Sequence, residues 1–138
     1  MERILVDVML MRLGRWLRLL GLDVANPPSP KDRDLLQLAR LEDRTLITRD
    51  RQLAEMCRSA GVACLLIQSS LLEDQLRELA GLGLAMELNP QRCTLCNGLL
   101  APVSEQLWKC ERCGKLYWEG SHWRRMAETL QKIRRQES

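Results

Sequence analysis

Apolar residues in the first 88 positions follow two patterns: short uninterrupted runs, and longer stretches in which they recur every three or four residues. The short runs predict buried strands at 3–7, 23–25, 45–48 and 62–67. The helical spacing predicts helices at 9–20, 32–42, 51–59 and 71–80. We expect Gly21 and Gly61 to end two of these helices and Ser70 to begin the last one. Strands that alternate with helices across short loops predict an α/β fold with a mostly parallel sheet.

The remaining 50 residues show a different pattern. Glycine, asparagine and proline residues at 81–90 predict a linker. Three short apolar segments that fit strand hairpins follow it: 99–103, 107–109 and 115–118. Ser121 is expected to cap a terminal helix, and four of the five aromatic residues lie between positions 108 and 123. We therefore predict an α/β domain over residues 1–88 and a small module over 89–138.

Composition and charge narrow the class of protein. The 138 residues are 46% hydrophobic and 28% charged, which is the balance of a folded globular chain. No apolar run reaches the ~18 residues of a membrane span, and Asp7 interrupts the first apolar stretch with no signal-peptide cleavage site after it. We expect a cytoplasmic protein with no membrane partner. The net charge of +3 divides unevenly: residues 88–138 carry 9 basic and 5 acidic side chains, a balance that suits a nucleic-acid partner but does not establish one.

The strongest motif is a pair of Cys-x2-Cys sequences separated by thirteen residues: Cys93 and Cys96, then Cys110 and Cys113. Two such turns can place four thiolates tetrahedrally around one Zn²⁺, so we predict a zinc ribbon. Gly98 and Gly114 follow the pairs, where a tight turn needs positive φ. Four thiolates leave no open position on the metal, which indicates a structural zinc. Two disulfides or a redox pair are the alternative, disfavoured in a cytoplasmic chain. Cys57 and Cys64 lack this spacing and are expected to be buried apolar residues.

Acidic residues gather at the predicted strand ends. Asp7 and Asp50 each follow a strand, and Asp32 and Asp34 begin a helix. Ligands of open parallel sheets bind at the carboxyl edge, and close carboxylates there would need a cation such as Mg²⁺ or Mn²⁺. Such a site suits phosphodiester hydrolysis. Helix capping or turn formation accounts equally well for each of these residues except Asp7, which ends an apolar strand.

Other hydrolytic chemistries fit less well. The chain has no glycine-rich phosphate loop, which excludes nucleotide hydrolysis by a P-loop. Its single histidine, His122, leaves little scope for a serine hydrolase triad.

Four segments, in order along the chain, carry a resemblance to a known family: 4–10, 13–21, 46–50, which reads Leu-Ile-Thr-Arg-Asp, and 117–123, which reads Tyr-Trp-Glu-Gly-Ser-His-Trp. Together with the cysteine pairs, they resemble the Mut-seven C-terminal RNase domain, a PIN-like fold with a zinc ribbon. The resemblance implies a ribonuclease dependent on Mg²⁺ or Mn²⁺, with Asp7, Asp32 and Asp50 as its catalytic, metal-binding acids and Asp34 as a possible helper. PIN nucleases generally use a fourth acid near a later strand, and positions 62–70 contain none.

Substrate contacts are expected from the arginines near these acids. Arg12, Arg15 and Arg18 share one helical face beside Asp7, and Arg49 adjoins Asp50. They are candidates for RNA phosphates, with a solvated face of ion pairs as the alternative.

The tryptophans of the tail also have two interpretations. Trp118 and Trp123 are either stacking platforms for bases or the small core that fastens the ribbon, and the second is favoured. We predict a metal-dependent ribonuclease that acts on RNA. A non-catalytic RNA-binding or ribosome-associated module is the main alternative, and a toxin of a toxin–antitoxin pair is a weaker one.

Overall fold

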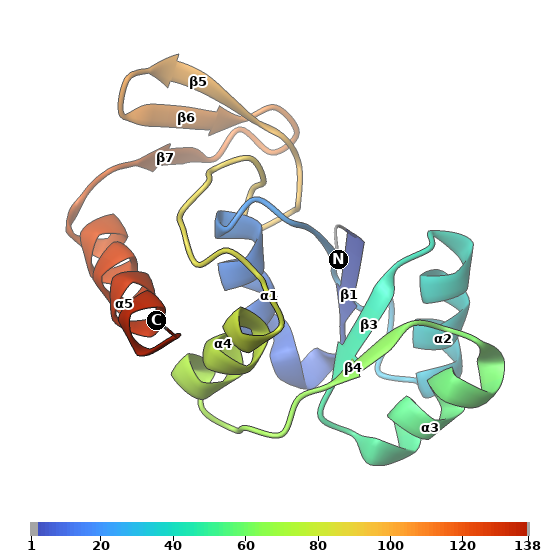
Figure 1. Ribbon diagram of the computed structural model, residues 1–138. Coiled ribbons are helices and arrows are strands. Elements are labelled where there is room, and N and C mark those ends of the chain that lie inside the picture. Colours follow the sequence, from blue (N-terminus) through green and yellow to red (C-terminus); the bar gives the residue numbers. More distant parts are fainter. Residues whose placement is uncertain (1–2, 138) are drawn as a thin grey trace.

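The computed structural model describes residues 3–137 and contains a four-stranded parallel sheet at its centre (Figure 1). The strands are β1 (Arg3–Val6), β2 (Asp23–Ala25), β3 (Thr45–Thr48) and β4 (Cys64–Leu66), in the spatial order β2-β1-β3-β4. Residues of β1 pair with both neighbours, so that Leu5 lies opposite Ala25 and Leu46. Each crossover contains a helix, which confirms the predicted α/β fold.

Helices cover both faces of this sheet. One face carries α1 (Met11–Leu19), which follows a short 3₁₀ helix η1 (Val8–Leu10), together with α4 (Leu72–Gly81). The other face carries α2 (Asp32–Leu41) and α3 (Arg51–Ala60). Successive strand residues point to opposite faces. Ile4 and Val6 therefore pack in the core with α1, whereas Leu5 packs in the second core with α2 and α3.

The tail forms a second, three-stranded antiparallel sheet in the order β5-β6-β7. Its strands are β5 (Leu100–Ser104), β6 (Leu107–Cys110) and β7 (Leu116–Trp118), and they are followed by the terminal helix α5 (Ser121–Glu137). This helix packs beside α4, and its Leu130 and Ile133 are fully buried in the same core as α1. The division at residue 88 stays a prediction, but the terminal helix shares the hydrophobic core of the α/β body.

Several local details differ from the sequence-based expectations. The helix predicted from position 9 begins instead as η1, because the Asp7 carboxylate accepts the Met9 N–H at 2.9 Å and caps a 3₁₀ turn. Ser70 does not cap α4, since Leu71 precedes the helix with extended backbone and no side-chain cap. Ser121 is the first residue of α5 and not its cap.

The glycine at the end of α3 behaves as predicted. Gly61 takes the left-handed conformation with φ 70°, which a β-carbon would disfavour. Among the helices within residues 3–137, none combines the length and apolar character needed to cross a membrane.

Candidate functional site

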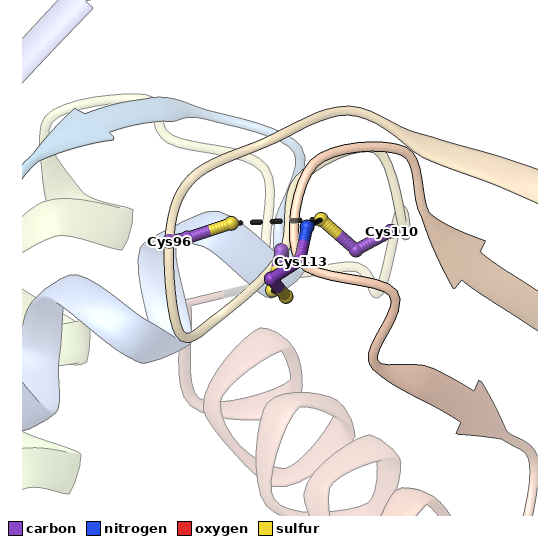
Figure 2. A group of neighbouring side chains, drawn as sticks. Cys96, Cys110 and Cys113 are labelled. Atoms are coloured by element: carbon purple, nitrogen blue, oxygen red, sulfur yellow. Dashed lines mark hydrogen bonds between the residues drawn. The ribbon is translucent and has the colours of Figure 1, made fainter.

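The four cysteines of the paired motifs converge on one point. Their sulfur atoms all lie within 4.8 Å of one another, with Cys93 Sγ 3.7 Å from Cys113 Sγ and Cys96 Sγ 3.5 Å from Cys110 Sγ. Figure 2 shows the side chains of Cys96, Cys110 and Cys113 pointing toward one another from the two loops of the ribbon. Zinc–sulfur bonds of about 2.3 Å in a tetrahedron give sulfur–sulfur distances of about 3.8 Å. The four residues are therefore positioned to bind a metal ion.

Backbone amides point at the sulfur atoms of this cluster. The N–H groups of Arg112 and Cys113 each donate to Cys110 Sγ at 3.4 Å. Burial of Cys110 opposes ionisation, but these two hydrogen bonds, together with those from the Cys96 and Cys113 thiols, outweigh it and lower the pKa of the Cys110 thiol to about 6. A thiolate is the form that binds a metal, so the surroundings of Cys110 already favour the ligand state of that residue.

The glycines after the two pairs have different functions. Gly114 has φ 80°, as predicted, but in the first loop the left-handed residue is Asn97 with φ 66° and not Gly98. Asparagine tolerates this conformation, and its side chain is then free to bind another element. Gly98 is required for space instead, because a Cβ there would lie 2.9 Å from Arg112 Cβ and 3.0 Å from Cys110 Sγ.

The first cysteine loop docks on the free edge of strand β2. Asn97 Oδ1 accepts the Val24 N–H at 3.1 Å, and Asn97 Nδ2 donates to Asp23 Oδ1 at 2.7 Å. Arg18 donates to Val24 O through Nη2 at 2.6 Å and to Thr94 O through Nη1 at 2.7 Å. The ribbon therefore covers an otherwise unpaired strand edge.

This arrangement corrects the prediction for Arg18. The side chain is only 2% exposed, so it cannot contact RNA with its neighbours Arg12 and Arg15. Its Nε also donates to Val24 O at 2.9 Å. Burial lowers the pKa of Arg18, and the nearby Cys93 and Cys96 thiolates partly offset that shift. Arg18 is a structural residue that joins the body to the cysteine cluster.

The acidic edge lies at the carboxyl ends of β1 and β3. Asp7 is 6% exposed, and its Oδ2 accepts a short hydrogen bond from the Thr48 hydroxyl. The same hydroxyl oxygen accepts the Asp50 N–H at 3.0 Å. The parallel pairing of β1 with β3 produces this contact, because Val6 lies opposite Ile47 and each strand end is polar. Thr48 thus links two of the predicted acids, although sequence reasoning gave it no role.

The other acids stand at helix starts. Asp50 caps α3, where its Oδ1 accepts the Gln52 N–H at 2.8 Å. Asp32 is the first residue of α2, and its carboxylate forms no hydrogen bond or ion pair within residues 3–137. Asp34 accepts a hydrogen bond from the Ser29 hydroxyl at 2.6 Å. Asp50 therefore has the capping function considered above, whereas neither Asp32 nor Asp34 is the capping residue of α2, which is Lys31.

These carboxylates are not gathered as the cysteines are. Within the described chain, the four cysteines are the group of three or more candidate ligands whose donor atoms all lie within 4.8 Å of one another. Asp7, Asp32 and Asp50 do not form a second such group. Their joint action on a metal ion stays a prediction.

The remaining arginines are exposed near this edge. Arg12 and Arg15 project from α1, and Arg49 follows β3; none of the three forms a hydrogen bond or ion pair with the residues that the structure describes. They are available to an anionic ligand.

A further acid, Glu78, reaches the same edge of the sheet from α4. Its Oε1 accepts the Gln68 N–H at 3.0 Å, and its Oε2 accepts the Ser69 N–H at 2.9 Å. Burial opposes ionisation of Glu78, but these bonds outweigh it and lower the pKa of the carboxyl group. Glu78 holds the loop after β4, the region where the sequence contains no acid. No local pattern identifies it, because its partners lie nine and ten residues away.

The two remaining cysteines match their predicted character. Cys57 is fully buried in α3, and Cys64 is half-buried in β4. Burial raises the pKa of both thiols, that of Cys64 to about 12, so they are protonated at neutral pH. They belong to the apolar packing beneath α3.

A parallel α/β body with acids at its carboxyl edge, joined to an antiparallel sheet that presents four cysteines, defines a PIN-like domain with a C-terminal ribbon. The comparison with family models agrees: the Mut7-C RNAse domain matches residues 2–107 and 102–130. The chain belongs to the Mut7-C RNAse domain family. A search among curated proteins gave no match.

Proposed function

We propose that this protein is a metal-dependent ribonuclease in which Asp7, Asp32 and Asp50 hold Mg²⁺ or Mn²⁺ at the carboxyl edge of the sheet. The family supports a nuclease-like role. RNA is the substrate that the family description names, and the basic residues of the chain suit a phosphodiester backbone.

The observation that carries the proposal is the environment of Asp7. Its buried carboxylate receives hydrogen bonds from the Met9 N–H and the Thr48 hydroxyl, and no cationic side chain pairs with it in the part of the chain that the structure describes. A buried charge is normally paired or bound to a metal ion. The oxygen ligands of carboxylates are those that Mg²⁺ and Mn²⁺ prefer.

In this proposal each of the candidate residues has a defined role. When bound, the divalent cation lowers the pKa of its bound water and neutralises the leaving oxygen. Asp7 is the fixed ligand. Asp50 and Asp32, whose carboxylate has no partner among the residues that the structure describes, complete the set. Asp34 assists Asp32, while Arg12, Arg15 and Arg49 bind phosphates of the substrate.

The four-cysteine cluster has a different function in this proposal. Zinc bound by four thiolates has no position for water, so it stabilises the fold and takes no part in the chemistry. The ribbon docks on the outer edge of β2 at Asp23 and Val24, which pair with Arg3 and Ile4 in the first half of β1, whereas Asp7 follows the carboxyl end of that strand.

A non-catalytic RNA-binding module is the second candidate. The observation that favours it is the separation of the carboxylates, which do not gather within 4.8 Å as the cysteines do. In that case the exposed arginines would bind RNA and the acids would have lost their function.

The decisive experiment measures cleavage of labelled RNA by protein freed of Mg²⁺ and Mn²⁺, with each ion then titrated back. Zinc content is measured before and after this step, so that the ribbon is known to be intact. We expect either ion to restore cleavage. Asp7→Asn is expected to lower the rate by about 100-fold or more, because it removes the charge that holds the metal.

Asp43→Asn is the matched control. Asp43 is exposed and has φ 52°, a conformation that asparagine accepts, so the same chemical change there is expected to leave the rate unaltered. RNA that stays uncut with both ions, or an Asp7→Asn variant that cuts as fast as the parent, would overturn the ribonuclease and favour the binding module.

A further inference from the structure

A cavity of about 350 Å³ lies where β7, the first turn of α5 and the last turn of α1 meet. Its lining combines three aromatic rings with polar and cationic groups: Lys115, Tyr117, Trp118, Ser121, His122 and Trp123. Small-ligand sites occupy about 300–1,000 Å³ and join apolar walls to a few polar groups. The cavity has the size of a site for one flat group such as a nucleobase, and it lies apart from the acidic edge.

Two of the three tryptophans in the tail pack against each other in the small core of the ribbon. Trp108 and Trp123 stack with ring centroids 5.5 Å apart and planes 15° from parallel. The neighbouring Tyr117 points its hydroxyl into the cysteine cluster, where it lies 3.0 Å from Cys93 Sγ. The favoured interpretation of the sequence, a small core that holds the ribbon, therefore applies to Trp123, whose helix α5 also packs in the core of the α/β body, but it is wrong for Trp118.

Trp118 does not belong to that core. Successive residues of a strand point to opposite sides, so the side chain after Tyr117 faces away from the cysteines. Trp118 is 64% exposed. An exposed indole gives up the stabilisation that burial of a large aromatic side chain provides. The packing of the ribbon therefore does not account for a tryptophan at this position.

Backbone contacts hold the exposed indole in place. A Cβ at Gly120 would lie 3.0 Å from Trp118 Nε1 and 3.2 Å from Cδ1, so the ring rests against the backbone at position 120. The Gly120 N–H also donates to the Trp118 carbonyl at 3.0 Å. The ring is oriented before any ligand binds, which lowers the entropy cost of binding.

One cationic side chain lines the cavity: Lys115, whose Nζ lies 5.0 Å from the centroid of the Tyr117 ring. Arg124 and Arg125 are exposed in the first two turns of α5, the helix that also supplies Ser121, His122 and Trp123 to the lining. Within residues 3–137, none of these three cations forms an ion pair. Exposed aromatic rings beside unpaired cations match a ligand with flat bases and a charged backbone, as in single-stranded nucleic acid. A base inside a duplex is covered on both faces by its neighbours and could not stack on the Trp118 indole.

We propose that this cavity binds an unstacked base of single-stranded RNA, with the Trp118 indole as the stacking surface and Lys115 beside the flanking phosphate. The inference rests on the proposed function only in taking RNA as the substrate class. Helix α1 connects the two sites, since it begins just after the Asp7-capped turn and ends at Leu19 on the cavity wall. The three residues of η1 and the nine of α1 together span at most about 20 Å, which a few extended nucleotides can cover.

The test measures the binding of fluorescein-labelled 12-nucleotide oligouridylate by anisotropy, without Mg²⁺ or Mn²⁺ so that no cleavage occurs. Trp118→Ala is expected to raise the dissociation constant about tenfold. Trp118→Phe, which keeps a stacking face, is expected to stay within about threefold of the parent. Gly120→Ala, which displaces the indole without removing it, is expected to weaken binding as well.

Controls separate stacking from general attraction. Val103→Ala removes an exposed apolar side chain elsewhere on the ribbon, 57% exposed, and is expected to leave the affinity unchanged. A blunt-ended RNA duplex of 12 base pairs is expected to bind more weakly, with no response to Trp118→Ala. Equal affinity of Trp118→Ala and the parent for oligouridylate, or an equal loss for the duplex, would overturn the proposal. Self-association of the parent that Trp118→Ala abolishes would assign the cavity to a second copy instead.

The base-binding cavity and the ribonuclease activity can be disproved independently of each other. If Asp7→Asn loses cleavage while Trp118→Ala binds RNA normally, the enzyme stands and the base-binding cavity does not. If no ion restores cleavage while Trp118→Ala still weakens binding, the cavity stands and the enzyme does not.

Discussion

The four-cysteine cluster and the acidic edge are both candidate metal sites, yet they differ in how completely the protein assembles them. The cysteine sulfurs lie as close together as a tetrahedral metal requires, and backbone amides already point at them. At the acidic edge, Asp50 caps α3 and Asp34 accepts a hydrogen bond from Ser29, whereas the Asp32 carboxylate has no hydrogen-bond or ion-pair partner among residues 3–137. Among these acids, only Asp7 is buried, and no cationic side chain of the described residues pairs with it.

This difference follows from how each site is encoded. Two short loops determine the position of all four sulfurs, so the geometry is local. The acids come from three separate elements, and like charges brought close together repel one another unless a cation neutralises them. A fixed cluster suits a metal that holds a fold together. A looser set of carboxylates around one fixed ligand suits a metal that arrives with substrate, as Mg²⁺ often does.

The largest expected effect comes from breaking the cysteine cluster. Cys110→Ser removes one thiolate of four, and we expect zinc content to fall from about one ion per chain to nearly none. The free energy of unfolding should drop by several kcal/mol, because structural zinc contributes its binding energy to folding. Metal analysis and thermal unfolding measure both effects. Since the first cysteine loop docks on β2, the α/β body should unfold at lower temperature too.

Cys64→Ser provides the matched control for this change. Cys64 is half-buried in β4 and lies outside the cluster, so zinc content should stay near one ion per chain. A Cys110→Ser variant that keeps its zinc, or a parent whose four thiols are paired as disulfides, would contradict the zinc assignment.

The contrast between locally encoded and long-range contacts also explains which features the sequence could predict. The cysteine spacing, the period of the apolar residues and the acids after β1 and β3 are local signals, and the structure confirms the elements that they predict. Gly61 and Gly114 also have the expected left-handed backbone. Asp7 could be singled out because it ends an apolar run, and the structure places it beside Thr48 at the strand ends.

Other residues depend on contacts between distant parts of the chain. Arg18 has the helical spacing of a surface arginine, but the ribbon, 76 residues away at Thr94, covers it. Asn97 replaces Gly98 as the left-handed residue because its side chain binds the edge of β2. Glu78 reaches the loop after β4 only once α4 has folded back. The sequence order of these residues contains no sign of such contacts.

The acidic edge offers a test of intermediate size. Thr48→Val keeps the shape of a fully buried side chain but removes the hydroxyl that donates to Asp7 and accepts from the Asp50 amide. We expect a loss of about 1–3 kcal/mol in the free energy of unfolding, because the buried Asp7 carboxylate and the partly buried Asp50 N–H each lose a partner. RNA cleavage should fall further than this loss explains, since Asp7 is no longer fixed. Thr45→Val, at the other end of β3, is the control and should leave cleavage unchanged. Equal cleavage by the two variants would show that Thr48 does not position the acid.

The smallest expected effect concerns the contact between the ribbon and strand β2 of the α/β body. Asp23 accepts hydrogen bonds from Asn97 of the ribbon and from Arg44, 2.9 Å away. Burial opposes ionisation of Asp23, but these two partners outweigh it and lower the pKa of the carboxyl group below its ordinary value. The charged form therefore stabilises the fold fully above about pH 4, the usual value for an unfolded chain, and this stabilisation is lost as the pH falls through the lower folded-state pKa.

Asp23→Asn should accordingly lower the free energy of unfolding by about 1 kcal/mol at pH 7, a figure reduced for the partial exposure of the carboxylate. The difference between parent and variant should shrink toward zero as the pH falls below about 4, because the parent then loses the same charge. Urea unfolding at a series of pH values measures it, provided that zinc is still bound at each one. Asp43→Asn, exposed and without a partner in the described chain, should stay within about 0.5 kcal/mol of the parent. A difference that grows on acidification would mean that the neutral carboxyl is the stabilising form, and that the ribbon is held to β2 by Arg18 and Asn97 without help from the Asp23 charge.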